Sequence, residues 1–305
     1  MNLRPYDRQR DFERIGEFLI QTYQPGDQLL NWLQPRWEYM HFHPNIKAVN
    51  LEKIGVFEEA GEIVGVVNLE HSERQAYFQV RPGYEHIKPT MFAYAEANFQ
   101  GISQSTGRLI RALYINDFDS TLSQLAESNG YEKWVDFAEG YSRFWLDKPV
   151  PDVDIPEGFC LQSLAEEVNL EKINRVLWRG FNHPGPPPEE EIPGRKEVMQ
   201  APNFRKDLTI VVVAPDGNYA TYCGMWVVPA NRVAYVEPVA TDPDYRRMGL
   251  GKAAVLESLR RAADSGAEVA WVGSDQEFYK SIGFETTFTV YPWVKVLDLR
   301  EDQFT

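Results

Sequence analysis

The residues best suited to chemistry in this sequence surround one polar loop near its end. The loop, Asp242 to Met248, leads into two glycines, Gly249 and Gly251, and then into a helical pattern that runs to Ala263. A glycine-rich turn that opens a helix leaves backbone N–H groups unpaired at the positive end of the helix dipole, which suits a phosphate or pyrophosphate. Glycine is needed because a Cβ would keep such a ligand away from the backbone. The sequence therefore predicts an anion-binding loop here.

Two familiar phosphate-binding patterns do not fit this loop. The G-x-x-x-x-G-K-[ST] pattern of nucleoside triphosphatases fails, because Ala253 follows Lys252 where a magnesium-binding hydroxyl is required. The dinucleotide pattern matches Gly249, Gly251 and Ala254, but it needs a strand that runs directly into the first glycine within a βαβ unit. Here a polar loop intervenes and the preceding strands read as hairpins. We therefore expect neither a nucleoside triphosphatase nor a Rossmann dehydrogenase.

A third pattern, R-x-x-G-x-G, fits the loop from Arg246 to Gly251, and an F-Y-x-x-x-G-F sequence follows from Phe278 to Phe284. Together the two motifs resemble the GNAT superfamily of acyl-CoA-dependent N-acyltransferases, and the resemblance covers residues 159–297. One departure is that residues 273–275, Gly-Ser-Asp, stand where the family commonly has an asparagine upstream of the tyrosine helix. The resemblance implies an N-acetyltransferase in which a primary amine attacks acetyl-CoA directly in a ternary complex.

The resemblance assigns the co-substrate acetyl-CoA to the loop and to the strand that precedes it. It implies that backbone N–H groups of the loop bind the pyrophosphate and that the strand end pairs with the pantetheine arm. It also implies that a backbone N–H near Val239 polarises the thioester carbonyl. The residues implied in binding are Val239, Ala240, Thr241, Arg246, Arg247, Met248, Gly249, Leu250, Gly251 and Lys252.

Two catalytic side chains are also implied by the resemblance. Tyr279 matches the family's tyrosine that protonates the departing thiolate, and Glu237 lies where many members place the acid that deprotonates the amine. A base is needed because an amine with a pKa of about 10 must lose its proton before it attacks. The alternatives stay open that Tyr279 is a core aromatic residue and that Glu237 is a structural carboxylate. Pro238, next in the chain, predicts a bulge where the strand splays.

The acceptor cannot be identified from the sequence. Polyamines, amino acids, aminoglycoside-like antibiotics and peptide amines stay open, as does the length of the acyl group. The run Glu189–Glu191 is either a solvated loop or an attraction for a cationic amine. A non-catalytic acyl-CoA sensor or interaction module is the alternative function. The aromatic candidates for an acceptor pocket or for the core are Trp178, Phe181, His183, Trp226, Tyr291 and Trp293.

The elements that must position these residues occur twice in the same order. A proline-rich and acidic stretch, residues 148–158, predicts an extended linker. On either side we expect a strand, a helix, three strands in an antiparallel meander, and then helix, strand, helix and strand. The segment Asn182–Gly194 predicts a loop without regular structure. The expected fold is α+β (α/β in some schemes), with two tandem GNAT-like domains, residues 1–147 and 159–305, each a mixed, mainly antiparallel central sheet flanked by helices.

The first half lacks the chemistry of the second. Gln79 stands where Glu237 would be and cannot act as a base, and Ala126 stands where Tyr279 would be. No G-x-G follows its strand, and Pro89 removes one N–H donor. We expect a degenerate copy that packs against the active half or shapes its acceptor cleft.

Composition narrows the partners and the compartment. With 45 acidic and 31 basic residues the net charge is −14, which argues against nucleic acid and anionic membrane as partners. No apolar run approaches the about 18 residues that a membrane span needs, and the start has no apolar signal core, so we expect a cytoplasmic protein. Cys160, Cys223 and the five histidines show no metal-ligand spacing, so we expect no metal. The expected partner is a small-molecule or peptide amine, and a homodimer stays open.

Overall fold

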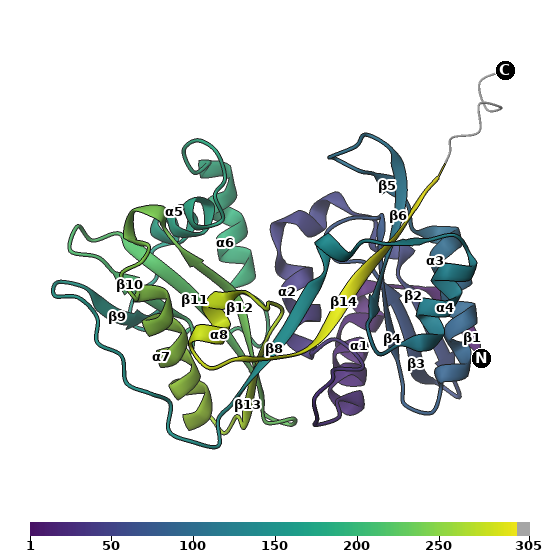
Figure 1. Cartoon of the computed structure of the whole chain (residues 1–305), viewed down its shortest axis with the longest axis horizontal. Coiled ribbons are helices and arrows are strands. Elements are labelled where there is room, and N and C mark those ends of the chain that lie inside the picture. Colours follow the sequence, from purple (N-terminus) through teal and green to yellow (C-terminus); the bar gives the residue numbers. More distant parts are fainter. Residues whose placement is uncertain (298–305) are drawn as a thin grey trace. The chain divides into compact units, whose positions relative to one another are not determined.

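The computed structural model describes residues 1–297, and the chain divides into two compact units. Within the described residues, unit 1 comprises Met1–Gln34, Asn45–Gly140 and residues 287–297, and unit 2 comprises Pro35–Pro44 and Tyr141–Thr286. In each unit helices lie against a central sheet (Figure 1).

Unit 1 is built on a mixed sheet in the order β1-β2-β3-β4-β6-β14, with β5 beside β6 and β7 beside β14. The β4–β6 pair is parallel, and its neighbours along this order are antiparallel. The strands are β1 (Asn2–Pro5), β2 (Gly55–Glu59), β3 (Glu62–Asn68), β4 (Gln75–Val80), β5 (Gly101–Ile102), β6 (Leu109–Asn116), β7 (Glu132–Lys133) and β14 (Glu285–Val296), and the helices are α1 (Arg8–Thr22), α3 (Lys88–Asn98) and α4 (Ser120–Ser128).

Unit 2 repeats this pattern with the strand order β8-β13-β12-β11-β10-β9. Its β12–β13 pair is parallel and the other pairs are antiparallel. The strands are β8 (Glu139–Trp145), β9 (Cys160–Ser163), β10 (Ile210–Val213), β11 (Tyr219–Val228), β12 (Val233–Thr241) and β13 (Val269–Val272), and the helices are α2 (Gln34–Phe42), α5 (Leu170–Gly180), α6 (Ile192–Val198), α7 (Leu250–Asp264) and α8 (Glu277–Ser281). The expected α+β class, with mixed and mainly antiparallel sheets flanked by helices, is confirmed.

The compact units differ from the contiguous domains, residues 1–147 and 159–305, that the sequence predicts. The late strand β14 pairs with β6 and β7 within unit 1, and β8 from the first half pairs with β13 in unit 2. Residues Pro35–Pro44, which carry most of α2, also belong to unit 2. Any open sheet edge can satisfy the backbone groups of a strand, so the periodicity of a strand does not identify its partner. Residues 148–158 contain no helix or strand.

Helices cover both faces of the unit 2 sheet because side chains along its strands alternate. On β11, Cys223 and Met225 pack in the cluster with α7, whereas Tyr222 packs in the cluster with α5. Helix α5 begins where the Asn169 side chain accepts a hydrogen bond from the backbone N–H of Lys172, as an N-cap does. The sheet therefore holds α5 on one face and α7 on the other.

The expectation of no regular structure over Asn182–Gly194 is wrong at its end. A 3-10 turn spans Glu189–Glu191, and α6 starts at Ile192 with Pro193 in its first turn. Proline is tolerated there because the first N–H groups of a helix have no partner within it. The many prolines and glutamates of this segment predicted a loop, although its last three residues begin a helix.

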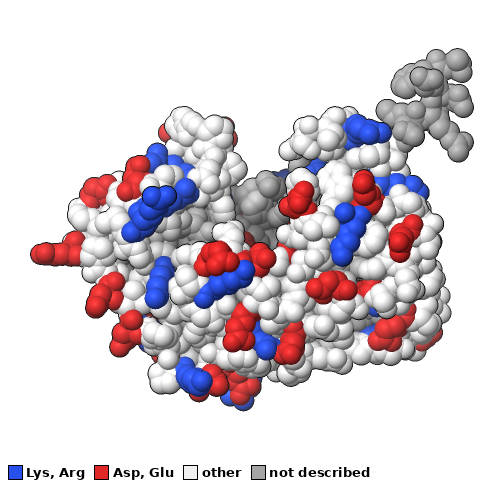
Figure 2. Space-filling view, viewed as in Figure 1, with Lys and Arg blue, Asp and Glu red and all other residues white. Residues whose placement is uncertain are grey.

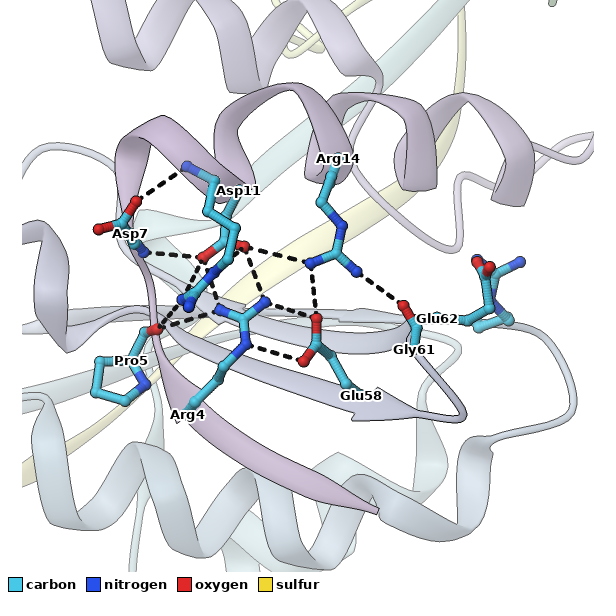
Figure 3. A network of polar contacts seen from close by, with 10 residues as sticks. Arg4, Pro5, Asp7, Asp11, Arg14, Glu58, Gly61 and Glu62 are labelled. Carbon is cyan, nitrogen blue, oxygen red and sulfur yellow. Dashed lines mark hydrogen bonds and ion pairs between the residues drawn. The ribbon is translucent and has the colours of Figure 1, made fainter.

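One ionic network ties the first elements of unit 1 together (Figure 3). The Asp11 side chain is completely buried and accepts hydrogen bonds from Arg4 Nη1 and Nη2 at 2.7 and 2.8 Å and from the Asp7 N–H at 2.9 Å. Burial alone would raise the pKa of Asp11, but the hydrogen bonds from Arg4 and Arg10 outweigh it and hold this pKa well below its usual range. Glu58 on β2 pairs with the same Arg4, so the network joins β1, α1 and β2.

Charged side chains of both signs are interspersed over the face shown in Figure 2. Within residues 1–297, no helix combines the length and the apolar character needed to cross a membrane.

Candidate active site

The site is built where β12 and β13 diverge. The two strands pair in parallel from Val233 to Tyr235 and from Val269 to Trp271, while β12 continues to Thr241. On its other edge β12 remains paired with β11 as far as Thr241. The last part of β12 therefore has one edge turned away from β13, where an extended ligand can bind in the manner of an added strand.

A bulge shapes this part of β12, and the expected interruption at Pro238 is confirmed. The β11–β12 register shifts between Cys223 and Met225, so that Gly224 faces Glu237 and Pro238. A Cβ on Gly224 would overlap the Glu237 carbonyl oxygen and lie 3.0 Å from Pro238 Cδ. The bulge therefore requires glycine at position 224.

A cavity of about 830 Å³ opens at the divergence and brings the predicted residues together. This volume lies in the range of small-molecule sites. Met248, which the sequence placed among the binding residues, is 38% exposed and does not line it. The predicted residues that do line it are Glu237, Val239, Ala240, Thr241, Arg246, Arg247, Gly249, Leu250, Gly251, Lys252 and Tyr279.

The two glycines of the loop are required for different reasons. Gly249 is the N-cap of α7 with φ of +79°, in the left-handed region that favours glycine. A Cβ on Gly251 would lie 3.1 Å from Thr241 Oγ1 and 3.3 Å from the Phe278 ring, so this position has no room for a side chain. Residues Gly249 to Lys252, at the start of α7, line the cavity, and the first N–H groups of a helix have no partner within it.

Of three basic side chains beside the loop, two have no hydrogen-bond or ion-pair partner among the described residues, and the third binds backbone carbonyls. Within residues 1–297, neither Arg247 nor Lys252 makes a side-chain hydrogen bond or ion pair, and both line the cavity. Arg246 instead donates from Nε to the Thr241 carbonyl at 3.1 Å and from Nη2 to the Gly180 carbonyl at 2.8 Å. Arg247 and Lys252 are therefore the side chains available to an anionic ligand.

Tyr279 and Glu237 reach the same cavity from α8 and β12. Tyr279 is 8% exposed, and its ring lies against Phe278 and Phe284 at centroid distances of 5.0 and 5.5 Å. Burial raises the pKa of Tyr279 far above its usual range, and the nearby Cys223 and Glu237 raise it further. The hydroxyl is therefore held in its protonated form, as a proton donor requires.

Cys223 is not a candidate nucleophile. Its side chain is completely buried, and this burial raises the pKa of the thiol to about 12. A thiol acts as a nucleophile only as the thiolate, so Cys223 behaves as a core residue.

The aromatic residues considered for an acceptor pocket separate in the structure. Phe181 lines the cavity, Trp178 stacks on His183 at 4.4 Å, and Trp226 is a core residue with 1% exposure. Tyr291 and Trp293 lie on β14, in unit 1.

The sequence did not predict that Tyr39 of α2 lies beside the bulge of β12. Its ring lies 6.3 Å from that of Trp226, and with Pro238 it borders a small cavity of about 20 Å³. No motif marks this segment, because only tertiary contacts carry α2 into unit 2.

The corresponding part of unit 1 carries different groups. Strand β4 pairs in parallel with β6 at Gln75 and Ala76 and then continues without it, as β12 does. Gln79, three residues after Ala76 as Glu237 is after Ala234, is buried and accepts a hydrogen bond from the Trp32 N–H at 2.8 Å. An amide thus replaces the carboxylate.

The loop after β4 and the helix α4 also differ from their counterparts in unit 2. The Glu85 carboxylate accepts the Gly83 N–H at 3.0 Å, so this loop binds a carboxylate of its own chain. Ala126 of α4 is completely buried. Among the residues that the structure describes in either unit, no group of three or more His, Cys, Asp and Glu side chains could hold a metal ion.

Comparison with known sequences finds a family model that matches the part of the chain that contains this site. Residues 170–284 match the model of the acetyltransferase (GNAT) family. An uncharacterized N-acetyltransferase of Methanocaldococcus jannaschii is 31% identical over 91 residues, which are 27% of this chain and 40% of that protein. The match thus spans less than half the length of that relative.

Solved structures extend the likeness to the whole chain. A GCN5-related N-acetyltransferase from Sphaerobacter thermophilus superposes with a TM-score of 0.64 at 16% identity, covering 97% of this chain and 95% of that one. A tandem GNAT protein from the clavulanic acid biosynthesis pathway gives a TM-score of 0.66 at 16% identity, covering 97% and 98%. At this identity the likeness shows the fold alone, and both of these structures share it over nearly the whole chain.

Proposed function

We propose that this chain, which belongs to the GNAT superfamily in a tandem arrangement, is an N-acetyltransferase that transfers an acetyl group from acetyl-CoA to a primary amine. The observation that carries the proposal is the convergence of the glycine loop, Glu237 and Tyr279 on one cavity of unit 2. Unit 1, with Gln79 and Ala126 at the corresponding positions, would have no catalytic part.

The residues of the loop fit the pyrophosphate of acetyl-CoA. The first turn of α7 offers N–H groups, Gly251 leaves no side chain in their way, and Arg247 and Lys252 add two uncommitted positive charges. The edge of β12 that β13 leaves unpaired, at Val239, would pair with the pantetheine arm, while Arg246 Nε already holds the Thr241 carbonyl. Acetyl-CoA would supply the acetyl group as a thioester that an amine can attack directly.

Glu237 is the proposed general base. Its side chain lines the cavity beside the proposed thioester position, and a carboxylate there can take a proton from an ammonium group directly or through one water. The backbone N–H groups of β12 near Val239 would stabilise negative charge on the carbonyl oxygen during the attack.

Tyr279 is the proposed general acid. A phenol is protonated at neutral pH, so Tyr279 Oη can give its proton to the thiolate as that group departs.

The acceptor would be a small-molecule or peptide amine, and the reaction would take place in the cytoplasm. These two points rest on composition and on the family resemblance, and the site residues do not select among the amines considered above.

The decisive experiment is calorimetric titration of the purified chain with acetyl-CoA, followed by an amine panel read out by released free thiol. We expect saturable binding and thiol release with at least one amine. Absence of binding at millimolar acetyl-CoA would refute the proposal. Binding without transfer to any amine would favour an acyl-CoA sensor instead.

A further inference from the structure

The loop that lines the cavity begins at a carboxylate whose side chain is completely buried. This residue, Asp242, follows β12 directly and is the N-cap of a one-turn 3-10 helix, Pro243–Tyr245. A buried carboxylate is costly unless each oxygen has partners, so its partners show what it holds in place.

Two arginines of α5 bind this carboxylate. Asp242 Oδ2 lies 2.7 Å from Arg179 Nε and 2.7 Å from Arg175 Nη1. Asp242 Oδ1 accepts hydrogen bonds from Arg179 Nη2 at 3.1 Å and from the Asp244 N–H at 3.0 Å. Arg175 and Arg179 stand one helical turn apart, so one face of α5 holds the start of the loop.

A third arginine makes the same connection in the opposite direction. Arg246, within the loop, donates to the Gly180 carbonyl at 2.8 Å and to Asn182 Oδ1 at 2.9 Å, at the end of α5. The C-terminus of a helix attracts a cation, so this contact is favourable. The backbones also meet closely there, because a Cβ on Gly180 would lie 3.1 Å from the Thr241 nitrogen.

We propose that Asp242 is a positioning residue for the diphosphate of the coenzyme. It does not line the cavity, but through Arg175 and Arg179 it holds the loop so that the first N–H groups of α7 and the Arg247 and Lys252 side chains face the ligand. Arg246 also holds the loop against α5, because its guanidinium donates to the carbonyls of Thr241 and Gly180. This inference rests on the proposed function and adds a residue to it.

The proposal makes a distinction between two acyl donors. Acetyl-CoA carries the diphosphate that the loop would bind, whereas acetyl-pantetheine lacks it and would contact only the free edge of β12. Loss of the Asp242 carboxylate should therefore weaken the use of acetyl-CoA and leave the use of acetyl-pantetheine unchanged. A general loss of structure would weaken both.

The test compares Asp242→Asn with the wild-type chain, using both donors and the amine found in the panel. We expect the KM for acetyl-CoA to rise about tenfold, which is within the range for residues that act through a neighbour. We expect kcat at saturating acetyl-CoA and the KM for acetyl-pantetheine to stay within about twofold of wild type, because the reacting groups are untouched. Arg179→Lys, which keeps the charge but loses the two-pronged geometry, should give an intermediate KM for acetyl-CoA.

A matched control is available within the same unit. Arg205 and Asp207 also form a two-pronged pair, with distances of 2.8 and 2.6 Å, but neither lines the cavity. Asp207→Asn should leave the constants for both donors unchanged. If Asp242→Asn does not fold, Arg175→Gln, which removes one partner of Asp242 and does not line the cavity, should show the same donor-dependent pattern.

The possible results distinguish the proposed acetyltransferase function from the positioning role of Asp242. Failure of the wild-type chain to bind acetyl-CoA would refute the proposed function itself. An unchanged KM for acetyl-CoA in Asp242→Asn, or an equal rise for both donors, would overturn the positioning role while leaving the proposed function in place.

Discussion

The indole N–H of Trp226 donates a hydrogen bond to the carbonyl oxygen of Glu237 at 3.0 Å, inside the bulge between β11 and β12. The backbone of Glu237 is therefore held by a core residue, independently of its own side chain. Gly224 supports the same geometry from the opposite strand by leaving room for that carbonyl. A substitution that alters only the Glu237 carboxylate therefore tests its catalytic role, because the hydrogen bond from Trp226 still holds the backbone.

Replacement of Glu237 by Gln should remove the general base and leave the fold intact. We expect kcat/KM for the amine to fall by about 10²- to 10⁴-fold near neutral pH, the usual contribution of a positioned base. The deficit should shrink as the pH approaches the pKa of the amine, because free amine then forms without help. The measurement is a pH profile of thiol release. Glu268→Gln, at a surface ion pair with Arg232, serves as control and should keep the wild-type profile. A wild-type profile in Glu237→Gln itself would assign another base.

Tyr279→Phe should lower kcat by about 10²-fold or more while leaving the Kd for acetyl-CoA nearly unchanged, because only a proton donor is lost. An aryl thioester, whose thiolate leaves without protonation, should restore most of the rate. The measurement is the ratio of rates with the two donors. Tyr219→Phe removes the hydroxyl of another buried tyrosine that does not line the cavity, and it should leave this ratio alone. Equal losses with both donors would assign Tyr279 to the core.

Gly249→Ala should weaken acetyl-CoA binding beyond its effect on stability. Gly249 and Gly217 have φ of +79° and +81°, and neither has an atom within 4 Å of its added Cβ. Each alanine variant should therefore lose about 1 to 2 kcal/mol of stability from backbone strain alone. Only Gly249→Ala should also raise the Kd for acetyl-CoA in calorimetry, because its Cβ stands beside the N–H groups of α7. Equal Kd values in the two variants would refute an anion site at this loop.

Stability of unit 1 should depend on pH through Asp11. Its pKa is lowered in the folded state, so its contribution is complete above its unfolded pKa of about 4 and declines as the pH falls below that value. Asp11→Asn should cost about 3 kcal/mol near neutral pH, because it leaves Arg4 without one of its buried partners. The difference in unfolding free energy between wild type and Asp11→Asn should become smaller as the pH falls below about 4. Hydrogen exchange of the α1 amides measures this difference in stability. A difference that grows as the pH falls would contradict the lowered pKa of Asp11.

For comparison, an exposed pair should show little of this dependence. Arg205 and Asp207 are about as close as Arg4 and Asp11, with Nη2 and Oδ2 at 2.6 Å, but they are partly exposed to solvent. Asp207→Asn should cost less than about 1 kcal/mol at any pH, because solvent screens the pair.

The sequence alone determined the local elements and the chemistry of the loop. Runs of apolar residues between turn signals marked β10, β11 and β12, and the Gly249–Gly251 turn marked the start of α7, because these signals come from neighbours along the chain. The same local logic predicted the interruption at Pro238.

Only the tertiary structure decided which elements share a unit and which charges are free. The placement of α2 and β8 in unit 2 and of β14 in unit 1 depends on open sheet edges and helix-covered faces, which no periodicity encodes. Likewise, Arg246 and Arg247 are adjacent in sequence, yet the end of α5 engages Arg246 and leaves Arg247 to the cavity. Ion pairs and strand partners are contacts between distant residues, and the folded chain alone determines them.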